Sequence, residues 1–334
     1  MALARSAGPD RSTEPSQQDQ VLAYSVLFVD NSMSGCAPGR WPGIRRDCRM
    51  VNPKPNLDDF AGVLELLAER YSQVEGQGEQ SAEWVRSAIG SADTKLEALR
   101  FILEHSSSRG KPRLLDVGSQ IGSLPLYAMR LGIEATAVDN AELASDCGRI
   151  LREYGVDYRV GDIGKEHLPF ADGSFDFVTY MDVIEHHEYS PKRVLLEVRR
   201  VLAPGGCVII TTPNHASIYN RFSLVQGRSV NDPFNYFFET AKDQCVYLGH
   251  HREYTRVELR AALERTGFRV LQCAAMDEGL RPQLIDFRRA CARGWLPALR
   301  SQGRFLAAAI LGNVWSVLSL PFGRVLWAVG EKVD

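Results

Sequence analysis

The sequence lacks the cysteine spacing that disulfide frameworks and structural zinc sites require. Its seven cysteines are an odd number, lie scattered between positions 36 and 291, and include no Cys-x-x-Cys pair. Small secreted folds and zinc sites depend on paired or closely spaced cysteines. We therefore expect the cysteines to be small buried side chains, in a protein of a reducing compartment, the cytoplasm.

An excess of charge of one sign is also missing. The chain has 39 Lys and Arg residues against 41 Asp and Glu residues, which gives a formal net charge of −2. This balance provides no overall attraction for nucleic acid. No clean basic stretch precedes the short apolar run 21–29, and Asp30 ends that run, so we do not expect a secretion signal.

What the sequence does contain is a regular alternation of strand and helix patterns. Residues 1–56 have little of either and are predicted to form a disordered or irregular arm. Helical periodicity predicts an N-terminal helical cap over 57–110. Within 111–275, helical stretches separate apolar runs at 113–117, 134–138, 158–160, 175–180, 207–212 and 268–274. This alternation predicts an α/β fold, a doubly wound, Rossmann-like, mostly parallel sheet with helices on both faces.

A long insertion, 213–253, follows the fifth predicted strand. It carries aromatic residues at 233–238 and at 247. These rings could stack on a bound acceptor, or they could form the core of a lid.

Residues 276–334 are predicted to form a C-terminal extension. The stretch 305–323 has no charged residue and follows Arg300 and Arg304. We expect a helix packed on the domain, with peripheral contact to the inner face of a membrane as the alternative. A last strand is predicted at 325–329.

A glycine-bearing turn after the first predicted strand marks a candidate cofactor site. The strand ends at Asp116, and Gly118 and Gly122 bracket the turn into the next helix. In a doubly wound sheet, ligands bind at the carboxyl ends of the strands, and glycine lets them approach the backbone closely. Asp139 ends the second strand, where a carboxylate can accept both hydroxyls of an adenosine ribose. This much fits a dinucleotide and S-adenosylmethionine alike.

The glycine spacing argues against the dinucleotide. A dinucleotide loop needs the pattern GxGxxG, because its pyrophosphate binds backbone N–H groups at a helix N-terminus. Counting from Gly118, Gln120 and Ser123 occupy the second and third glycine positions.

The ordered series of short motifs over about 113–275 resembles class I S-adenosylmethionine-dependent methyltransferases, in particular the group with ubiquinone-type O-methyltransferases and enzymes that modify surface polysaccharides. The matching segments are 114–118 with Gly122, 138–139, 161–163, 168–170, 174–178, 183–186, 200–202 with Gly205 and Gly206, and 212–214. The family fold also ends with an antiparallel strand, so the resemblance implies that the last predicted strand is antiparallel.

The resemblance implies S-adenosylmethionine as the cofactor and assigns its site. The implied cofactor-binding residues are Asp116, Gly118, Ser119, Gln120, Gly122, Asp139, Asn140, Asp162, Ile163, Tyr180 and Met181. The two glycines would line the methionine part and Asp139 the ribose. Asp162 and Ile163 would hold the adenine, and Tyr180 and Met181 would lie near the sulfonium. The family usually has glycine at the position of Gln120, whose side chain could crowd the methionine carboxylate or donate a hydrogen bond to it.

Candidate catalytic residues follow the fourth predicted strand. They are Asp182, Glu185 and His186. If Asp182 begins a helical turn, the other two lie at i+3 and i+4 on its face. His186 is the favoured general base because histidine titrates near neutral pH. A similar acid, acid, His triplet in ubiquinone-type enzymes is associated with a divalent metal, so Mg²⁺ and a purely structural role stay open; no metal ligand is assigned.

Candidate acceptor-binding residues lie in a second cluster before the helix that a Thr255–Glu258 capping box opens. They are His250, His251, Arg252 and Tyr254, to which we add His187. Arg252 could bind a phosphate or carboxylate, or it could pair with Glu253 and fix the helix start.

These residues together predict an S-adenosylmethionine-dependent methyltransferase. The preferred reaction is O-methylation of a saccharide or lipid-linked saccharide hydroxyl, with release of S-adenosylhomocysteine. The alternatives are a phenolic or quinone-like acceptor and a non-catalytic S-adenosylmethionine-binding protein. The expected partner is thus a small-molecule or saccharide acceptor.

Overall fold

The structure is a computed structural model that describes residues 54–74, 85, 87–106, 110–231, 249–276 and 323–333. Three predictions concern residues outside these ranges: most of the N-terminal arm, the aromatic residues of the insertion, and the helix at 305–323 with its membrane contact. Among the helices within the described ranges, none is both long and apolar enough to cross a membrane.

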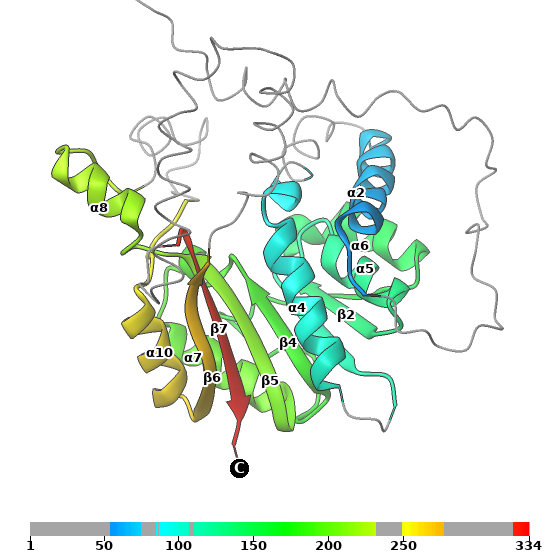
Figure 1. Ribbon diagram of the computed structural model, residues 1–334. Coiled ribbons are helices and arrows are strands. Elements are labelled where there is room, and N and C mark those ends of the chain that lie inside the picture. The colour runs from blue at the N-terminus through cyan, green and yellow to red at the C-terminus, as the bar shows by residue number, and fades with distance from the viewer. Residues whose placement is uncertain are drawn as a thin grey trace, which may run out of the picture. The chain divides into compact units, whose positions relative to one another are not determined.

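A seven-stranded sheet is the central element of the described chain (Figure 1). The strands are β1 (Arg113–Val117), β2 (Glu134–Asp139), β3 (Asp157–Val160), β4 (Phe175–Met181), β5 (Leu202–Pro213), β6 (Phe268–Met276) and β7 (Val325–Lys332). They lie in the order β3-β2-β1-β4-β5-β7-β6. The five strands β1 to β5 pair in parallel, and β7 is antiparallel to both β5 and β6. The predicted fold class, with its antiparallel last strand, is confirmed.

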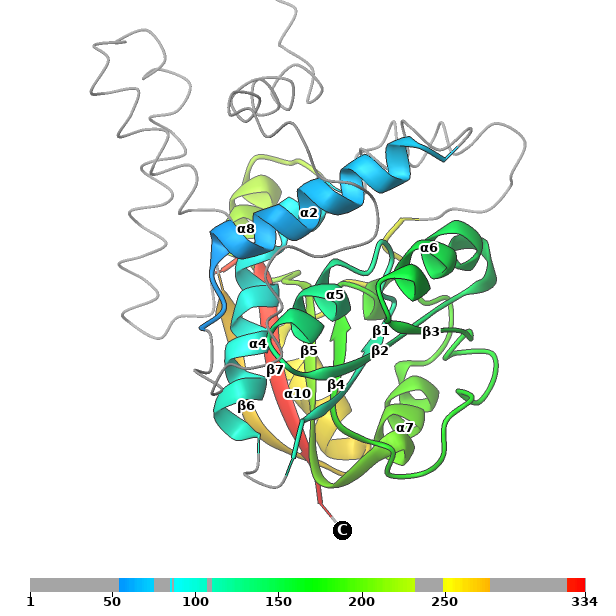
Figure 2. The same ribbon diagram turned by 90° about the vertical axis from the view of Figure 1, so that its right-hand side faces the viewer.

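Helices cover both faces of this sheet. They are α2 (Leu57–Ser72), α4 (Ala92–His105), α5 (Ser123–Arg130), α6 (Ala141–Glu153), the short 3₁₀ helix η1 (Ile184–His186), α7 (Pro191–Val201), α8 (Ile218–Val225) and α10 (Arg256–Arg265). Figure 2 shows α4 on one side of the sheet and α7 on the other. Successive strand residues point to opposite faces, so Leu114 packs in the core with α2, α4, α5 and α6, and Leu115 packs in the core with α7 and α10.

The N-terminal helices share their core with the sheet. Phe60 of α2 and Leu99 of α4 are fully buried in the same cluster as Leu114 of β1. The buried Tyr71 hydroxyl of α2 donates a hydrogen bond to the carbonyl oxygen of Ile121 at 3.2 Å. Helix α2 therefore contacts the loop that follows β1, where the cofactor site is predicted.

The predicted helix starts at α7 and α10 are confirmed. Ser190 caps α7 through its side chain, and Pro191 takes the first helical position, where no N–H is needed. At α10, Thr255 and Glu258 form the complete capping box. These caps fix where the segments after β4 and after the insertion turn back onto the sheet.

The carboxyl ends of β1, β2, β4 and β5 meet at one edge of the sheet. β1 lies between β2 and β4, so the chain leaves β1 toward one side of the sheet and later returns on its other side. In open α/β sheets this switch point is where ligands bind.

Candidate active site

The loop after β1 is built on three left-handed residues. Gly118, Gln120 and Gly122 have φ values of 73°, 47° and 71°. Glycine adopts this conformation without steric cost, whereas Gln120 carries a Cβ there and is strained. The left-handed φ at this position explains why the family usually has glycine there. Gln120 adopts the same left-handed φ, and its side chain is exposed.

Packing against the protein itself also requires the two glycines. A Cβ at Gly118 would lie 2.4 Å from Cγ2 of Val183, and one at Gly122 would lie 2.3 Å from Cδ1 of Leu151. Both distances are too short for nonbonded carbon atoms. The loop therefore lies directly on the segment after β4 and on α6, with no room for larger side chains.

Two buried carboxylates flank the loop. Asp139, at the end of β2, accepts backbone hydrogen bonds from Gln120 at 2.7 Å and from Asn140 at 2.8 Å, and burial raises its pKa. Asp116, at the end of β1, accepts a hydrogen bond from the Thr179 hydroxyl at 2.7 Å. Burial raises the pKa of Asp116 to about 7. Asp139 thus fixes the shape of the loop, and its carboxylate lies where a ribose is expected.

One polar group of this loop remains unsatisfied within the described protein. The hydroxyl oxygen of Ser119 is buried and has no hydrogen-bond partner there. Buried hydroxyls are almost always hydrogen-bonded, so an unsatisfied one in a glycine turn points to a polar ligand. The amino and carboxylate groups of the methionine part of S-adenosylmethionine would supply such a partner, and the loop residues fit the cofactor.

Asp162, after β3, is engaged by the protein on both oxygens. Oδ1 accepts the Tyr189 hydroxyl at 2.8 Å and the Gly164 amide at 3.1 Å, and Oδ2 lies 3.0 Å from the Lys165 ammonium. These partners hold the pKa of Asp162 below its usual range despite the opposing effect of burial. Ile163 beside it is buried. Any adenine bound here would share the carboxylate with Tyr189.

Tyr180 and Met181 end β4 and point to opposite faces. Tyr180 is fully buried and hydrogen-bonds through its hydroxyl to Nε2 of His187, and Met181 packs in the other core. The His187 ring stacks on Tyr180 and on Tyr189, with centroids at 5.9 and 4.8 Å. Burial lowers the pKa of His187 to about 4, so this ring is neutral. His187 therefore contacts the cofactor-side residues, whereas the sequence predicted a role in acceptor binding.

The expectation that Asp182 begins a helical turn is wrong. Asp182 has a left-handed φ of 56°, and the 3₁₀ turn starts two residues later at Ile184. Its amide donates to the carbonyl of Thr211, and its carboxylate accepts the Thr211 hydroxyl at 2.9 Å. Burial raises its pKa. Asp182 is held on β5 rather than on a helix face with Glu185 and His186.

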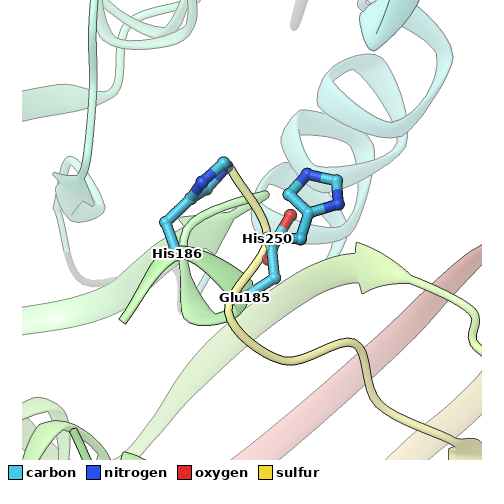
Figure 3. A group of neighbouring side chains, drawn as sticks. All are labelled: Glu185, His186 and His250. Carbon is cyan, nitrogen blue, oxygen red and sulfur yellow. The ribbon is translucent and has the colours of Figure 1, made fainter. Parts of the chain in front are cut away.

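Glu185, His186 and His250 converge in the structure. Each offers a ligand-type atom, and these atoms all lie within 4.8 Å of one another. Figure 3 shows the Glu185 carboxylate directed between the two imidazole rings, whose centroids are 4.9 Å apart. His250 comes from the end of the insertion, so this cluster, hereafter the Glu185 cluster, joins the two predicted groups of residues.

Glu185 is the most deeply buried member of the cluster. Its side chain is 0% exposed. Oε2 accepts the Thr212 hydroxyl at 2.9 Å, and Oε1 has no hydrogen-bond partner among the described residues. Burial, reinforced by the nearby Asp182, raises the pKa of Glu185 to about 8. Burial thus favours the protonated, neutral form of Glu185.

Backbone hydrogen bonds fix the second group against the first. The amides of His251 and Arg252 both donate to the carbonyl oxygen of Glu185, at 2.8 and 3.1 Å. Nδ1 of His186 lies 3.2 Å from the carbonyl oxygen of Gly249. The segment 249–252 is thereby held on η1.

A polar cavity of about 320 Å³ adjoins this segment. It is lined by His215, Asn231, His250, His251, Arg252, Glu253, Thr255 and Glu258. No described lining residue is aliphatic or aromatic apart from the imidazoles. The cavity therefore offers hydrogen-bond donors and acceptors on every described side.

Two predictions about this segment are corrected. Arg252 pairs with Glu258 at 2.7 Å rather than with Glu253, because the capping box places Glu258 at the helix start. Tyr254 is only 5% exposed and packs in the core, since its backbone bridges to Asn214 after β5. Of the predicted acceptor residues, His250, His251 and Arg252 line the cavity.

Sequence reasoning missed several residues that complete the site. From the end of β5, the Thr211 hydroxyl donates to Asp182 and the Thr212 hydroxyl donates to Glu185. Glu253 lies between the Nδ1 atoms of His215 and His250, at 3.4 Å from each. The only sequence signal for them is their position next to predicted strand ends and motifs.

Part of the chain is similar to known methyltransferases. Residues 115–210 match the family model described as a methyltransferase domain. The chain is 33% identical over 129 residues to the ubiquinone biosynthesis O-methyltransferase of Nitrosococcus oceani, an alignment that covers 38% of this chain and 54% of that one. It is 30% identical over 127 residues to the norajmaline N-methyltransferase of Rauvolfia serpentina, covering 36% and 43%. A solved S-adenosylmethionine-dependent methyltransferase from Mesorhizobium loti is 19% identical, with a TM-score of 0.45 and coverage of 71% and 97%.

The matched region thus forms a domain of the class I S-adenosylmethionine-dependent methyltransferase family. The chain spans about half the length of the curated relatives it matches. According to their names, the first of these relatives methylates an oxygen atom and the second a nitrogen atom.

Proposed function

We propose that the protein transfers a methyl group from S-adenosylmethionine to a hydroxyl of a saccharide or lipid-linked saccharide. The observation that carries the acceptor class is the polar cavity of about 320 Å³, which His250 joins to the Glu185 cluster. A polyhydroxylated acceptor can satisfy such a lining, whereas a quinone ring would cover these polar groups without giving most of them a hydrogen-bond partner.

The loop after β1 and the ends of β2 and β3 would hold the cofactor. Ser119 and the backbone of 118–122 would bind its methionine part, and Asp139 its ribose. Asp162 and Ile163 would contact the adenine. When bound, the cofactor supplies the electrophilic methyl group; the protein aligns the acceptor with it and excludes water.

A histidine of the Glu185 cluster, His186 or His250, would receive the hydroxyl proton. The sequence favours His186. Its Nδ1 faces the Gly249 carbonyl, which favours the tautomer whose Nε2 can accept a proton. The buried Glu185 lies against the imidazole pair. Removal of the proton makes the oxygen a better nucleophile.

Mg²⁺ at Asp182, Glu185 and His186 has less support. The ligand-type atoms that converge among the described residues come from Glu185, His186 and His250. Mg²⁺ prefers carboxylate and water oxygens in octahedral geometry, and two imidazoles do not provide them.

The test has two stages. Isothermal titration with S-adenosylmethionine should show binding to the wild type and much weaker binding to Asp139→Asn. An S-adenosylhomocysteine release assay then compares methyl glycosides and extracted polysaccharide intermediates with catechol and quinol acceptors. No cofactor binding would refute the proposal. Turnover of the phenolic panel alone would replace the acceptor class, and binding without any turnover would favour the non-catalytic alternative.

A further inference from the structure

The two histidines of the Glu185 cluster have different surroundings. His250 lines the polar cavity, and His186 is not among the described residues that line it. Both side chains contribute to the same convergence of ligand-type atoms with Glu185. A hydroxyl bound in the cavity would therefore meet His250 before it meets His186.

The Nδ1 atoms of these histidines also face different groups. Nδ1 of His250 lies 3.4 Å from Oε1 of Glu253, whereas Nδ1 of His186 faces a neutral backbone carbonyl. A carboxylate behind an imidazole fixes the Nδ1–H tautomer and stabilises the imidazolium that forms when Nε2 accepts a proton. Hydrogen bonds of catalytic groups are often this long before substrate binds. Glu253 and His250 thus have the arrangement of an oriented base.

We propose that His250, oriented by Glu253, is the catalytic residue that takes the acceptor proton, and that His186 is a positioning residue behind it. This inference deepens the proposed function and rests on it. The acceptor oxygen forms the new O–CH₃ bond while the methyl C–S bond breaks and the sulfur keeps its electron pair. The hydroxyl proton passes to Nε2 of His250, so charge and atoms balance without a further reactant.

Glu253 also links the base to the protein surface. Its Oε2 lies 3.4 Å from Nδ1 of His215, whose side chain is 42% exposed, against 14% for Glu253. Glu253 is thereby held between the two imidazoles. The His250 side chain is itself 27% exposed, so the proton on its Nε2 can leave directly to solvent after each methyl transfer.

Titratable groups also reach His250 from the segment after β4. Asp182 precedes η1, and Glu185 and His186 lie on η1. In their ionised forms the acidic groups favour a protonated His250, and a protonated His186 opposes it. Burial favours the neutral forms of both acids. The neighbouring His251 faces a different carboxylate, Glu188, at 3.9 Å.

Nuclear magnetic resonance of ¹⁵N-histidine-labelled full-length protein tests the arrangement without any acceptor. The chain has seven histidines, and the His250→Gln variant assigns the signal. We expect the Nδ1–H tautomer at His250, and a pKa of His250 that falls by about one unit or more in Glu253→Gln, because an opposite charge is lost. An Nε2–H tautomer, or a pKa of His250 that does not change, would overturn the proposal.

Steady-state kinetics tests whether His250 is the base. The assay uses whichever of the glycoside, polysaccharide, catechol and quinol acceptors is turned over most rapidly. His250→Gln should lower kcat by about 100-fold or more with little change in KM. His251→Gln, in the same cavity, should act mainly on KM, and His167→Gln, which pairs with Glu197, should change neither. Loss of kcat in His186→Gln but not in His250→Gln would overturn this inference alone. If the protein binds no S-adenosylmethionine, the proposed function is refuted as well.

Discussion

Replacing Gly118 with alanine tests whether the loop after β1 is shaped by its own packing before any cofactor binds. The new Cβ would lie 2.4 Å from Val183 and would take a left-handed φ of 73°. The φ strain costs roughly 1–2 kcal/mol and overpacking typically about 1–3 kcal/mol, so the free energy of unfolding should fall by about 2–5 kcal/mol.

Two further variants separate these contributions. Gly227 has a similar φ of 70° but nothing within 4 Å of an added Cβ, so Gly227→Ala should show the φ strain without the clash. Val183→Ala removes the atoms that clash, so the double variant with Gly118→Ala should recover the steric part, a coupling of about 1–3 kcal/mol.

The assay is urea unfolding of the four variants and the wild type without cofactor. Additive effects of the substitutions at 118 and 183 would refute the packing argument. A Gly118→Ala protein as stable as Gly227→Ala would also refute it. The glycine at 118 would then be needed only for the close approach of the cofactor to the backbone.

Other predictions concern the buried carboxylates and the strained loop. The pKa of Asp116 is about 7 in the folded protein against an ordinary value of 3.8, so the folded state binds the proton more tightly; the free energy of unfolding should fall as the pH rises from about 4 to 7, and Asp116→Asn should flatten this slope in urea titrations. Gln120→Gly should raise the free energy of unfolding by about 0.5–1 kcal/mol, because relief of the left-handed strain exceeds the entropic cost of glycine, whereas Gln120→Ala should give no such gain. Thr212→Val leaves Oε2 of Glu185 without its donor and should cost about 1–3 kcal/mol in the same assay; wild-type stability would contradict that hydrogen bond.

Local patterns were sufficient to predict most elements of the fold. The apolar run 113–117 coincides with β1, and the capping residues at 190 and 255 mark the starts of α7 and α10. Such signals depend on a few neighbouring residues, so they can be read without the tertiary structure. The exception is β5, which begins at Leu202 instead of 207, because Leu202 pairs with Phe175 across a register shift and the Pro-Gly-Gly sequence is carried within the strand.

The site itself depends on contacts between distant segments. Sequence order placed Glu185 and His250 in separate groups, and contacts between the two segments, such as the backbone hydrogen bonds from 251 and 252 to Glu185, bring them together. The left-handed φ of Asp182 is likewise invisible to periodicity, since it arises from pairing with Thr211. Residue types were predictable here, and their grouping was not.

The position of β7 affects how the sheet can form while the protein is being synthesised. β7 follows every other described strand in the chain, yet it lies between β5 and β6. Until it leaves the ribosome, β6 lacks the strand that joins it to the sheet, and β5 has an open, largely apolar edge. Open edges of this kind recruit other chains. A nascent protein interrupted before residue 325 would therefore be a target for chaperones or for aggregation, even with every residue of the cofactor loop already made.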